Sequence, residues 1–157
     1  MRIIIDTDPG TDDAVAILIA LANFNDEEIL GITTVAGNVG VKVGTRNALR
    51  ILEQAGRNNI KVYEGESVPL ERELLTAEWV HGTDGLGGVP FPEPSKKEED
   101  IDAVTFLKEE ILNSDEKVTL CVLGPMTNVG KAIQEKPEIV ENIDQIIFMG
   151  GSAAGGN

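Results

Sequence analysis

Cysteine, aromatic residues and basic residues are all scarce in this sequence, and each shortage excludes a class of protein. The 157 residues include one cysteine, Cys121, so an intramolecular disulfide and a thiolate metal cluster are both excluded. Cys121 lies in the apolar run 118–123, where we expect a small buried side chain rather than a nucleophile. Aromatic residues make up only 4% of the chain, so the core must be mostly aliphatic.

Positive charge is the second shortage. The chain has 13 Lys and Arg against 27 Asp and Glu, which gives a formal net charge of -14. Nucleic acids and anionic membranes are bound through clusters of Lys and Arg, so we expect neither as a partner. A cation or a neutral small molecule is compatible with this charge. Solubility alone is the alternative explanation for the acids outside the loop described below.

Long hydrophobic runs are absent as well. No segment is apolar for long enough to span a bilayer, and the N-terminus lacks the basic region and apolar stretch of a signal peptide. We therefore expect a cytoplasmic location. With 41% hydrophobic residues the chain is long enough to bury a core of its own, and we expect 1–157 to form a single α/β domain.

Strands and helices are predicted to alternate along the chain. Runs rich in Val and Ile predict strands at 2–6, 28–35, 60–63, 117–123 and 143–149. Helices are predicted at 12–23, 41–55, 100–112 and 125–133. This alternation predicts an α/β fold, with a mostly parallel sheet and helices on both faces. The first helix is apolar nearly all round, so we expect it to be buried.

The loops after the strands are where a site is expected. Right-handed crossovers place every strand-to-helix loop of a parallel sheet at one edge, and ligands bind there. The loops concerned, all dense in Gly, Asp and Asn, are 6–13, 35–39, 123–128 and 149–157. The segment 65–98 holds most of the prolines and the only Trp and His, which predicts a long irregular loop near the active site.

The acidic loop, residues 6–13, carries four carboxylates directly after a buried strand: Asp6, Asp8, Asp12 and Asp13. Like charges this close repel each other by several kcal/mol at an effective dielectric constant of about 20. A hard cation such as Ca²⁺, which takes about six to eight oxygen ligands, relieves that repulsion. The structural alternative is that Asp12 and Asp13 only favour a helix N-terminus, while Asp6 or Asp8 caps a turn.

Three known motifs do not fit the acidic loop. An EF-hand would need its glycine elsewhere and an acid at the position of Ile17. A phosphate-binding loop would need Gly-Lys followed by Ser or Thr, and the acids would repel phosphate. Asp6 and Asp8 match the first motif of haloacid dehalogenase-type phosphatases, but Gly10 stands where that motif needs Thr or Val.

Residues 6–14, Asp-Thr-Asp-Pro-Gly-Thr-Asp-Asp-Ala, resemble the N-terminal motif of the nucleoside hydrolase family, of the inosine-uridine preferring type. Segments that resemble further motifs follow in the family's order, at 33–39, 47–48, 81–87, 123–128 and 149–157. The resemblance therefore covers the whole chain. It implies a Rossmann-like nucleoside hydrolase fold, of which this chain would be the N-terminal part.

For the chemistry, the resemblance implies calcium-dependent hydrolysis of the N-glycosidic bond of a ribonucleoside. The products are ribose and the free base, and the transition state resembles an oxocarbenium ion. Asp8 would be a calcium ligand and the general base on the attacking water. Asp13 would be a second ligand, and Leu123 would lend its backbone carbonyl to the metal. The family often forms dimers or tetramers, which implies a homo-oligomer.

The resemblance also implies contacts with the substrate. Asp12 and Asn38 would hydrogen-bond the ribose or the water. Asn157 would contact the ribose, and Met149 would pack near the sugar. Asp6 would hold the acidic loop in shape without touching the substrate.

His81 and Trp79 leave alternatives open. His81, the only histidine, either is a structural residue or lies near the leaving base in a loop that closes over the pocket, where it would protonate that base. Trp79 either stacks on the nucleobase or anchors the loop, and we expect the second.

Members of the resembling family continue well beyond position 157, with further ribose contacts and a later His-Asp pair whose Asp binds calcium. These residues have no counterpart among positions 1–157, so we expect weak calcium binding and little turnover by this chain alone. A non-catalytic nucleoside-binding module or a truncated one is the alternative. The choice between purine and pyrimidine nucleosides stays open.

Overall fold

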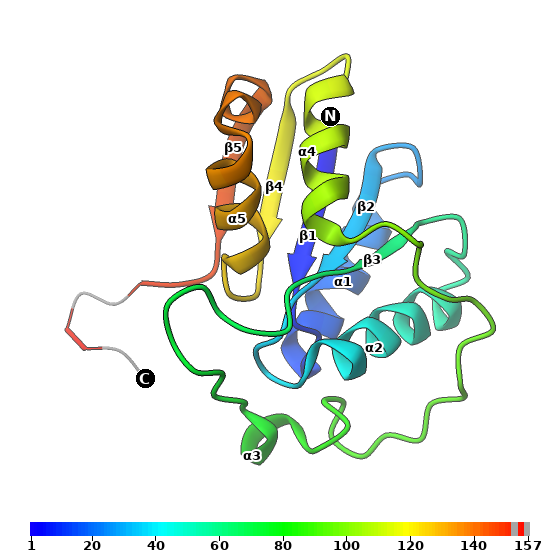
Figure 1. The fold of residues 1–157 in the computed structure, drawn as a ribbon. Helices are drawn as coiled ribbons and strands as arrows, with labels where there is room; N and C mark the ends of the chain where they lie inside the picture. Colours follow the sequence, from blue (N-terminus) through cyan, green and yellow to red (C-terminus); the bar gives the residue numbers. More distant parts are fainter. Residues whose placement is uncertain (152–153, 156–157) are drawn as a thin grey trace.

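The computed structural model describes residues 1–151 and 154–155, and its centre is a five-stranded parallel sheet (Figure 1). The strand order is β3-β2-β1-β4-β5. The strands are β1 (Arg2–Thr7), β2 (Ile29–Thr34), β3 (Val62–Glu64), β4 (Val118–Val122) and β5 (Ile143–Phe148). Every pairing between neighbours is parallel, which confirms the predicted α/β class.

Helices cover both faces of the sheet, as predicted. They are α1 (Thr11–Asn23), α2 (Val41–Gln54), α4 (Ala103–Asn113) and α5 (Thr127–Glu135), with the 3-10 helix η1 (Pro137–Asn142) before β5. The short helix α3 (Glu78–His81) and η1 were not predicted, because elements this short carry no periodicity that a sequence pattern can reveal. In the described part of the chain, no helix is long and apolar enough to cross a bilayer.

The side chains of the central strand β1 join the sheet to the helices on both of its faces. Side chains alternate across a strand, so Ile3 and Ile5 face one side and Ile4 faces the other. Ile3 and Ile5 pack in a core cluster with residues of α1 and α2, and Ile4 packs in a second cluster with residues of α4 and α5. A strand covered on both faces needs apolar side chains at every position, and this accounts for the uninterrupted run of isoleucines.

The helix α1 is less buried than its composition predicts. Ile17 and Leu21 point into the core, but Val15, Leu18 and Ile19 are 56%, 46% and 60% exposed. The expectation that α1 is buried all round was therefore wrong. An apolar composition favours burial but does not supply the neighbouring element, and in the described structure α1 packs along one stripe only.

A groove of about 370 Å³ lies between α1 and β4, on the side of the sheet that α1 covers. Its lining includes Ala16, Ile19, Ala20, Cys121 and Leu123. Cys121 is consequently half-buried rather than enclosed, and its surroundings still raise the pKa of the thiol through desolvation.

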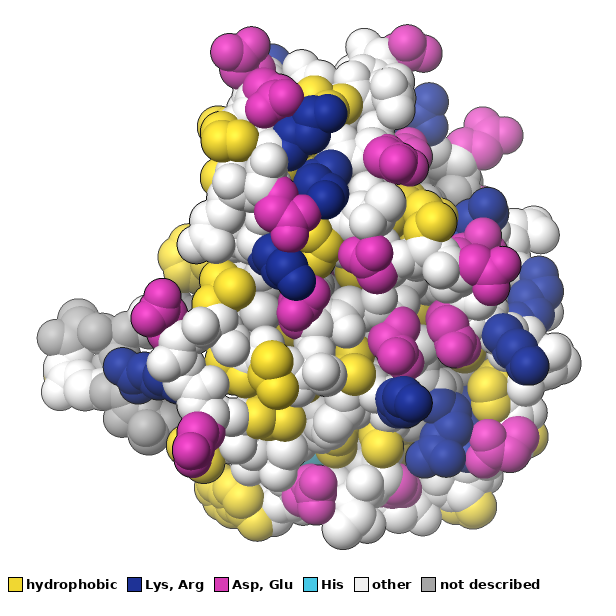
Figure 2. Space-filling model, in the orientation of Figure 1, with side chains coloured by type: hydrophobic (Ala, Val, Ile, Leu, Met, Phe, Trp, Pro, Cys, Tyr) yellow, Lys and Arg dark blue, Asp and Glu magenta, His cyan; other side chains and the backbone are white. Residues whose placement is uncertain are grey.

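The segment 65–98 is mostly irregular, as predicted, and its first part lies at the edge of the sheet to which the strand arrows point (Figure 1). Its one helix, α3, lies at that edge. Its last part returns alongside α2, where Pro92 and Ser95 bond Arg50 and Glu53. On the face drawn in Figure 2, acidic side chains are interspersed with basic ones, and no continuous basic surface is present on that face. The carboxyl edge of the sheet is thus the place where the predicted site residues can meet.

Two isoleucines of α1 give a direct test of this packing. Ile17 is fully buried and Ile19 is 60% exposed, although both lie on the same helix. We expect Ile17→Ala to lower the free energy of unfolding by about 3 kcal/mol, because it removes buried surface and leaves a cavity. We expect Ile19→Ala to change it by no more than about 0.5 kcal/mol. Urea denaturation measures both, and equal losses would contradict this difference in burial.

Candidate active site

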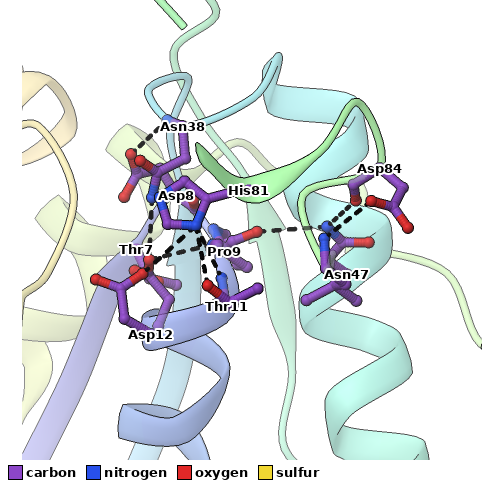
Figure 3. A network of polar contacts seen from close by, with 12 residues as sticks. Thr7, Asp8, Pro9, Thr11, Asp12, Asn38, Asn47, His81 and Asp84 are labelled. Atoms are coloured by element: carbon purple, nitrogen blue, oxygen red, sulfur yellow. Dashed lines mark hydrogen bonds and ion pairs between the residues drawn. The ribbon is translucent and has the colours of Figure 1, made fainter. Parts of the chain in front are cut away.

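The acidic loop leaves β1, passes through Pro9 and Gly10, and enters α1 at Thr11 (Figure 3). Three of its four carboxylates are buried: Asp6, Asp8 and Asp13 are 1%, 5% and 2% exposed. Asp12 lies on the exposed side of the first helical turn. The loop therefore concentrates negative charge inside the protein, where its desolvation has to be offset by hydrogen bonds or by a bound cation.

Asp8 is the carboxylate with the least satisfied oxygen atoms. Its Oδ2 accepts a hydrogen bond of 2.6 Å from the backbone N–H of Asn38, whereas its Oδ1 is buried without a hydrogen-bond partner. Burial raises the pKa of Asp8 to about 7, and the negative charge of Asp13 contributes in the same direction. An orphaned, buried carboxylate oxygen of this kind is suited to a cation or to a reacting water.

Two glycines allow Asp8 to lie where it does. A Cβ atom at Gly37 would overlap Oδ2 of Asp8, and a Cβ at Gly124 would lie 2.8 Å from Oδ1. The loops after β2 and β4 thus approach the carboxylate closely from two sides, and only residues without side chains permit this approach.

Asp13 and Asn38 form the rest of the cluster. Oδ1 of Asp13 accepts from the hydroxyl of Thr7 at 2.6 Å, and its Oδ2 accepts from the backbone N–H of Gly10 at 3.1 Å. The side-chain amide of Asn38 donates to Oδ2 of Asp13 at 3.1 Å and to the backbone carbonyl of Asp8 at 3.2 Å. Asp13 therefore caps α1, in line with the structural alternative, and also lies next to Asp8.

Leu123 lies at the end of β4, next to the acidic loop. Its backbone N–H donates to the carbonyl of Asp6 at 2.7 Å. Gly124 follows, and a Cβ built on it would lie 2.8 Å from Oδ1 of Asp8, so the chain at Leu123 and Gly124 passes close to the carboxylate cluster. The predicted group of Asp8, Asp13, Asn38 and Leu123 is thus brought together by three different strand ends.

Asp6 supports the loop from inside the sheet. Its Oδ2 accepts from the hydroxyl of Thr33 at 2.6 Å and from the side-chain amide of Asn128 at 2.8 Å, and its Oδ1 has no hydrogen-bond partner. Desolvation raises the pKa of Asp6 to about 6, against the lowering effect of those two hydrogen bonds. Sequence reasoning assigned no role to Asn128, because its partner is 122 positions away along the chain.

His81 lies over the start of α1 (Figure 3). Its Nδ1 is 3.3 Å from the backbone N–H of Thr11 and 3.1 Å from the hydroxyl of the same residue. A backbone N–H can only donate, so Nδ1 accepts in this contact, which places a ring proton on Nε2. Oδ1 of Asp12 lies further away, 3.9 Å from Nδ1.

Met149 is not part of the cluster, because it follows β5, two strands away from β1, and is 60% exposed. Asn157 lies outside the described residues, so its predicted ribose contact stays a prediction. Trp79 is 88% exposed, so the expectation that it anchors the loop was wrong. His81 is a buried residue of this loop, and its ring contacts Thr11 at the start of α1. The loop is therefore held there by polar contacts.

A cation would find a partial set of ligands here. Among the described residues, no three His, Cys, Asp or Glu side chains are grouped so that they could hold a metal ion. Asp8 and Asp13 provide two carboxylates, and the peptide at Leu123 provides neutral oxygen nearby. The unpartnered Oδ1 of Asp8 fits a cation site, and the remaining ligands would have to be water or substrate oxygens.

The raised pKa values predict how stability depends on pH when no cation is present. Asp6 and Asp8 keep their protons in the folded state up to pH values of about 6 and about 7, while the unfolded chain releases them near 3.8. The free energy of unfolding should therefore fall as pH rises from about 4 to about 7 and then level off. Urea denaturation across this range in the presence of a chelator measures the effect.

The variant Asp6→Asn isolates one of the two groups. It should flatten the fall between pH 4 and 6, which we expect to amount to about 2–3 kcal/mol for Asp6 because each pKa unit is worth about 1.4 kcal/mol. A slope that is identical in the variant and in the original chain would contradict the buried, protonated state of Asp6.

A glycine pair tests how tightly the loops enclose Asp8. Gly37→Ala places a methyl group on Oδ2 of Asp8, so we expect a loss of about 1–3 kcal/mol of unfolding free energy. Gly40→Ala is the matched control, because a Cβ at Gly40 meets nothing within 4 Å. Urea denaturation measures the loss in both variants. The enclosure is disproved if the two alanines behave alike.

Comparisons with known proteins agree with this geometry. The family model described as inosine-uridine preferring nucleoside hydrolase matches residues 3–157. An uncharacterised protein of Schizosaccharomyces pombe is 46% identical over 97% of this chain and 49% of its own length. The probable uridine nucleosidase 2 of Arabidopsis thaliana is 44% identical over 98% of this chain and 48% of its own.

Solved structures show the same correspondence. The purine-preferring ribonucleoside hydrolase from Gardnerella vaginalis superposes with a TM-score of 0.90 at 35% identity, over 97% of this chain and 49% of that one. The chain thus spans about half the length of the curated relatives it matches. Since the family model covers nearly every residue and the sheet superposes closely on that of a solved member, the chain belongs to the family of inosine-uridine preferring nucleoside hydrolases.

Proposed function

We propose that this chain takes part in the hydrolysis of the N-glycosidic bond of ribonucleosides, with Ca²⁺ bound at Asp8 and Asp13. The observation that carries the proposal is the state of Asp8. Its carboxylate is buried at the carboxyl edge of the sheet, next to a second carboxylate, with one oxygen free of any hydrogen-bond partner. Asp6 also has one oxygen without a partner, but the charge of a neighbouring carboxylate acts on Asp8 and not on Asp6, so Asp8 is the one that a cation would stabilise most.

Asp8 acts as the general base on the attacking water. Without a cation, burial and the charge of Asp13 raise its pKa to about 7; a bound cation would lower that pKa again, so Asp8 would be ionised and able to accept a proton near neutral pH. A divalent cation, when bound, polarises the attacking water and makes it easier to deprotonate. Asn38 holds the geometry, because its backbone and side-chain N–H groups reach Asp8 and Asp13 at the same time.

The other residues bind the cation or the substrate. Leu123 offers its carbonyl oxygen to the cation. Asp12, on the exposed first turn of α1, hydrogen-bonds the ribose. His81 accepts from Thr11 at Nδ1, so its Nε2–H group can donate a hydrogen bond to the departing base, and transfer of a proton to that base requires the protonated ring. For Met149 and Asn157 the ribose contacts stay predictions from the resemblance.

A non-catalytic nucleoside-binding module is the second candidate. It is favoured by the small ligand set, since two buried carboxylates leave most of a calcium coordination sphere to water. A haloacid dehalogenase-type phosphatase is disfavoured, because the Asp6 that would be its nucleophile is 1% exposed and hydrogen-bonded beneath the loop. A nucleophile has to reach its substrate.

Several finer features stay predictions. The relatives named above include a probable uridine nucleosidase and a purine-preferring hydrolase, so the family does not fix the base. The cytoplasmic location, the homo-oligomer and the role of 1–157 as the N-terminal part of a longer hydrolase domain are likewise expectations. Turnover by this chain alone is expected to be low, because its set of calcium ligands is incomplete.

Ribose release from uridine and inosine tests the proposal. We expect slow release of ribose in the presence of calcium and none in the presence of a chelator. In the presence of calcium, Asp8→Asn should lower the rate of release by a factor of roughly 10² to 10⁴ relative to the original chain. Asp144→Asn is the matched control, because Asp144 is exposed on β5. Calcium-dependent release that survives Asp8→Asn would remove Asp8 from the mechanism.

Two further outcomes identify the alternatives. Nucleoside binding by calorimetry without any ribose release, in a preparation that binds calcium, would establish a binding module. Release of phosphate from a phosphomonoester with Mg²⁺ would establish a phosphatase.

A further inference from the structure

We propose that Asn47 is a positioning residue that seats the His81-bearing turn, residues 81–88, on the acidic loop. Asn47 lies on α2 and is fully buried. Its side-chain amide donates to two backbone carbonyls, that of Asp84 at 2.7 Å and that of Pro9 at 3.3 Å (Figure 3). One amide group therefore joins the turn and the acidic loop. What this positioning serves rests on the proposed function, but the seating itself does not.

The turn fits its seat at Gly85. A Cβ atom there would lie 2.8 Å from Nδ2 of Asn47, 3.1 Å from the carbonyl of Pro9 and 3.2 Å from Cγ1 of Val39. Gly85 also has a φ of 76°, in the region that favours glycine. The backbone of the turn is thus pressed into a notch formed by Pro9, Val39 and Asn47.

The turn is braced internally by hydrogen bonds between its own residues. The carboxylate of Asp84 accepts from the backbone N–H of Leu86 at 3.2 Å and from that of Gly88 at 3.0 Å. The backbone N–H of Gly87 donates to the carbonyl of His81 at 2.8 Å. Holding Asp84 therefore also holds His81, whose ring accepts hydrogen bonds from Thr11 at the start of α1.

The hydrogen bonding of Asn47 is hard to explain by a role in α2 alone. Neither of the carbonyls that it bonds belongs to α2, and its Oδ1 is buried without a partner. A leucine has the same branched shape and no polar acceptor, whereas the Oδ1 of Asn47 is buried without a partner, which is normally unfavourable. Asn47 forms these hydrogen bonds through its amide N–H donors, and both acceptors lie on loops at the candidate site.

The test compares Asn47→Leu and Gly85→Ala with Gly88→Ala. Gly88 has a φ of 77°, so its alanine carries the same backbone strain as that at Gly85, but a Cβ there meets nothing within 4 Å. Hydrogen exchange of the backbone amide of Gly87 reports on the turn, and the ring nitrogens of the only histidine report on its contact with Thr11 by ¹⁵N NMR. Both are measured without substrate, so neither depends on whether the chain hydrolyses nucleosides.

We expect both seat variants to speed exchange at Gly87 by about tenfold, the loss that one net hydrogen bond implies, and to shift the His81 ring from a single Nε2–H form to a mixture of tautomers. Gly88→Ala should change exchange much less and leave the ring signals in place. Where ribose release is measurable, Asn47→Leu should lower kcat more than it changes KM. Two results overturn the proposal: equal effects of Gly85→Ala and Gly88→Ala, or His81 signals unchanged in both seat variants.

Discussion

The burial of the Asp8 carboxylate is the constraint on which the rest of the site depends. Removing a carboxylate from water is costly, and placing Asp13 beside it adds repulsion, which together raise the pKa of Asp8 to about 7. The acidic loop stays in place because hydrogen-bond donors reach most of its carboxylate oxygens. In addition, Gly37 and Gly124 allow the loops after β2 and β4 to approach the Asp8 carboxylate closely. One oxygen, Oδ1, is left without a donor.

The donors around these acids are amides and hydroxyls. Within the described structure, the hydrogen bonds to Asp6, Asp8 and Asp13 come from Thr and Asn side chains and from backbone N–H groups. Neutral donors stabilise a carboxylate without cancelling its charge, so the acids of the loop remain negatively charged when ionised. Asn38, Asn47 and Asn128 share one mode of action, since each joins segments that are distant in the sequence.

The fold supplies this arrangement through parallel strands. The ends of β1, β2 and β4 lie side by side, so the acidic loop, Asn38 and Leu123 meet without any long connection between them. Asn128 bonds Asp6, the carbonyl of Thr34 and the backbone N–H of Glu66, and so fixes three of the loop ends beneath the site. The helix α1 shows that an apolar composition does not by itself ensure burial, because its Leu18 and Ile19 are exposed.

The sequence by itself determined the strands, the four longer helices and the acidic loop, because periodicity and charge density are local properties of the chain. The meeting of Asp8, Asp13 and Asn38 followed from the rule that parallel strands end at one edge. Only the tertiary structure decided that α1 is half exposed, that Trp79 points to solvent, and that His81 accepts a hydrogen bond from Thr11. It also decided the roles of Asn47 and Asn128. Each of these depends on which distant backbone groups lie within about 3 Å of a side chain, and no local pattern encodes that distance.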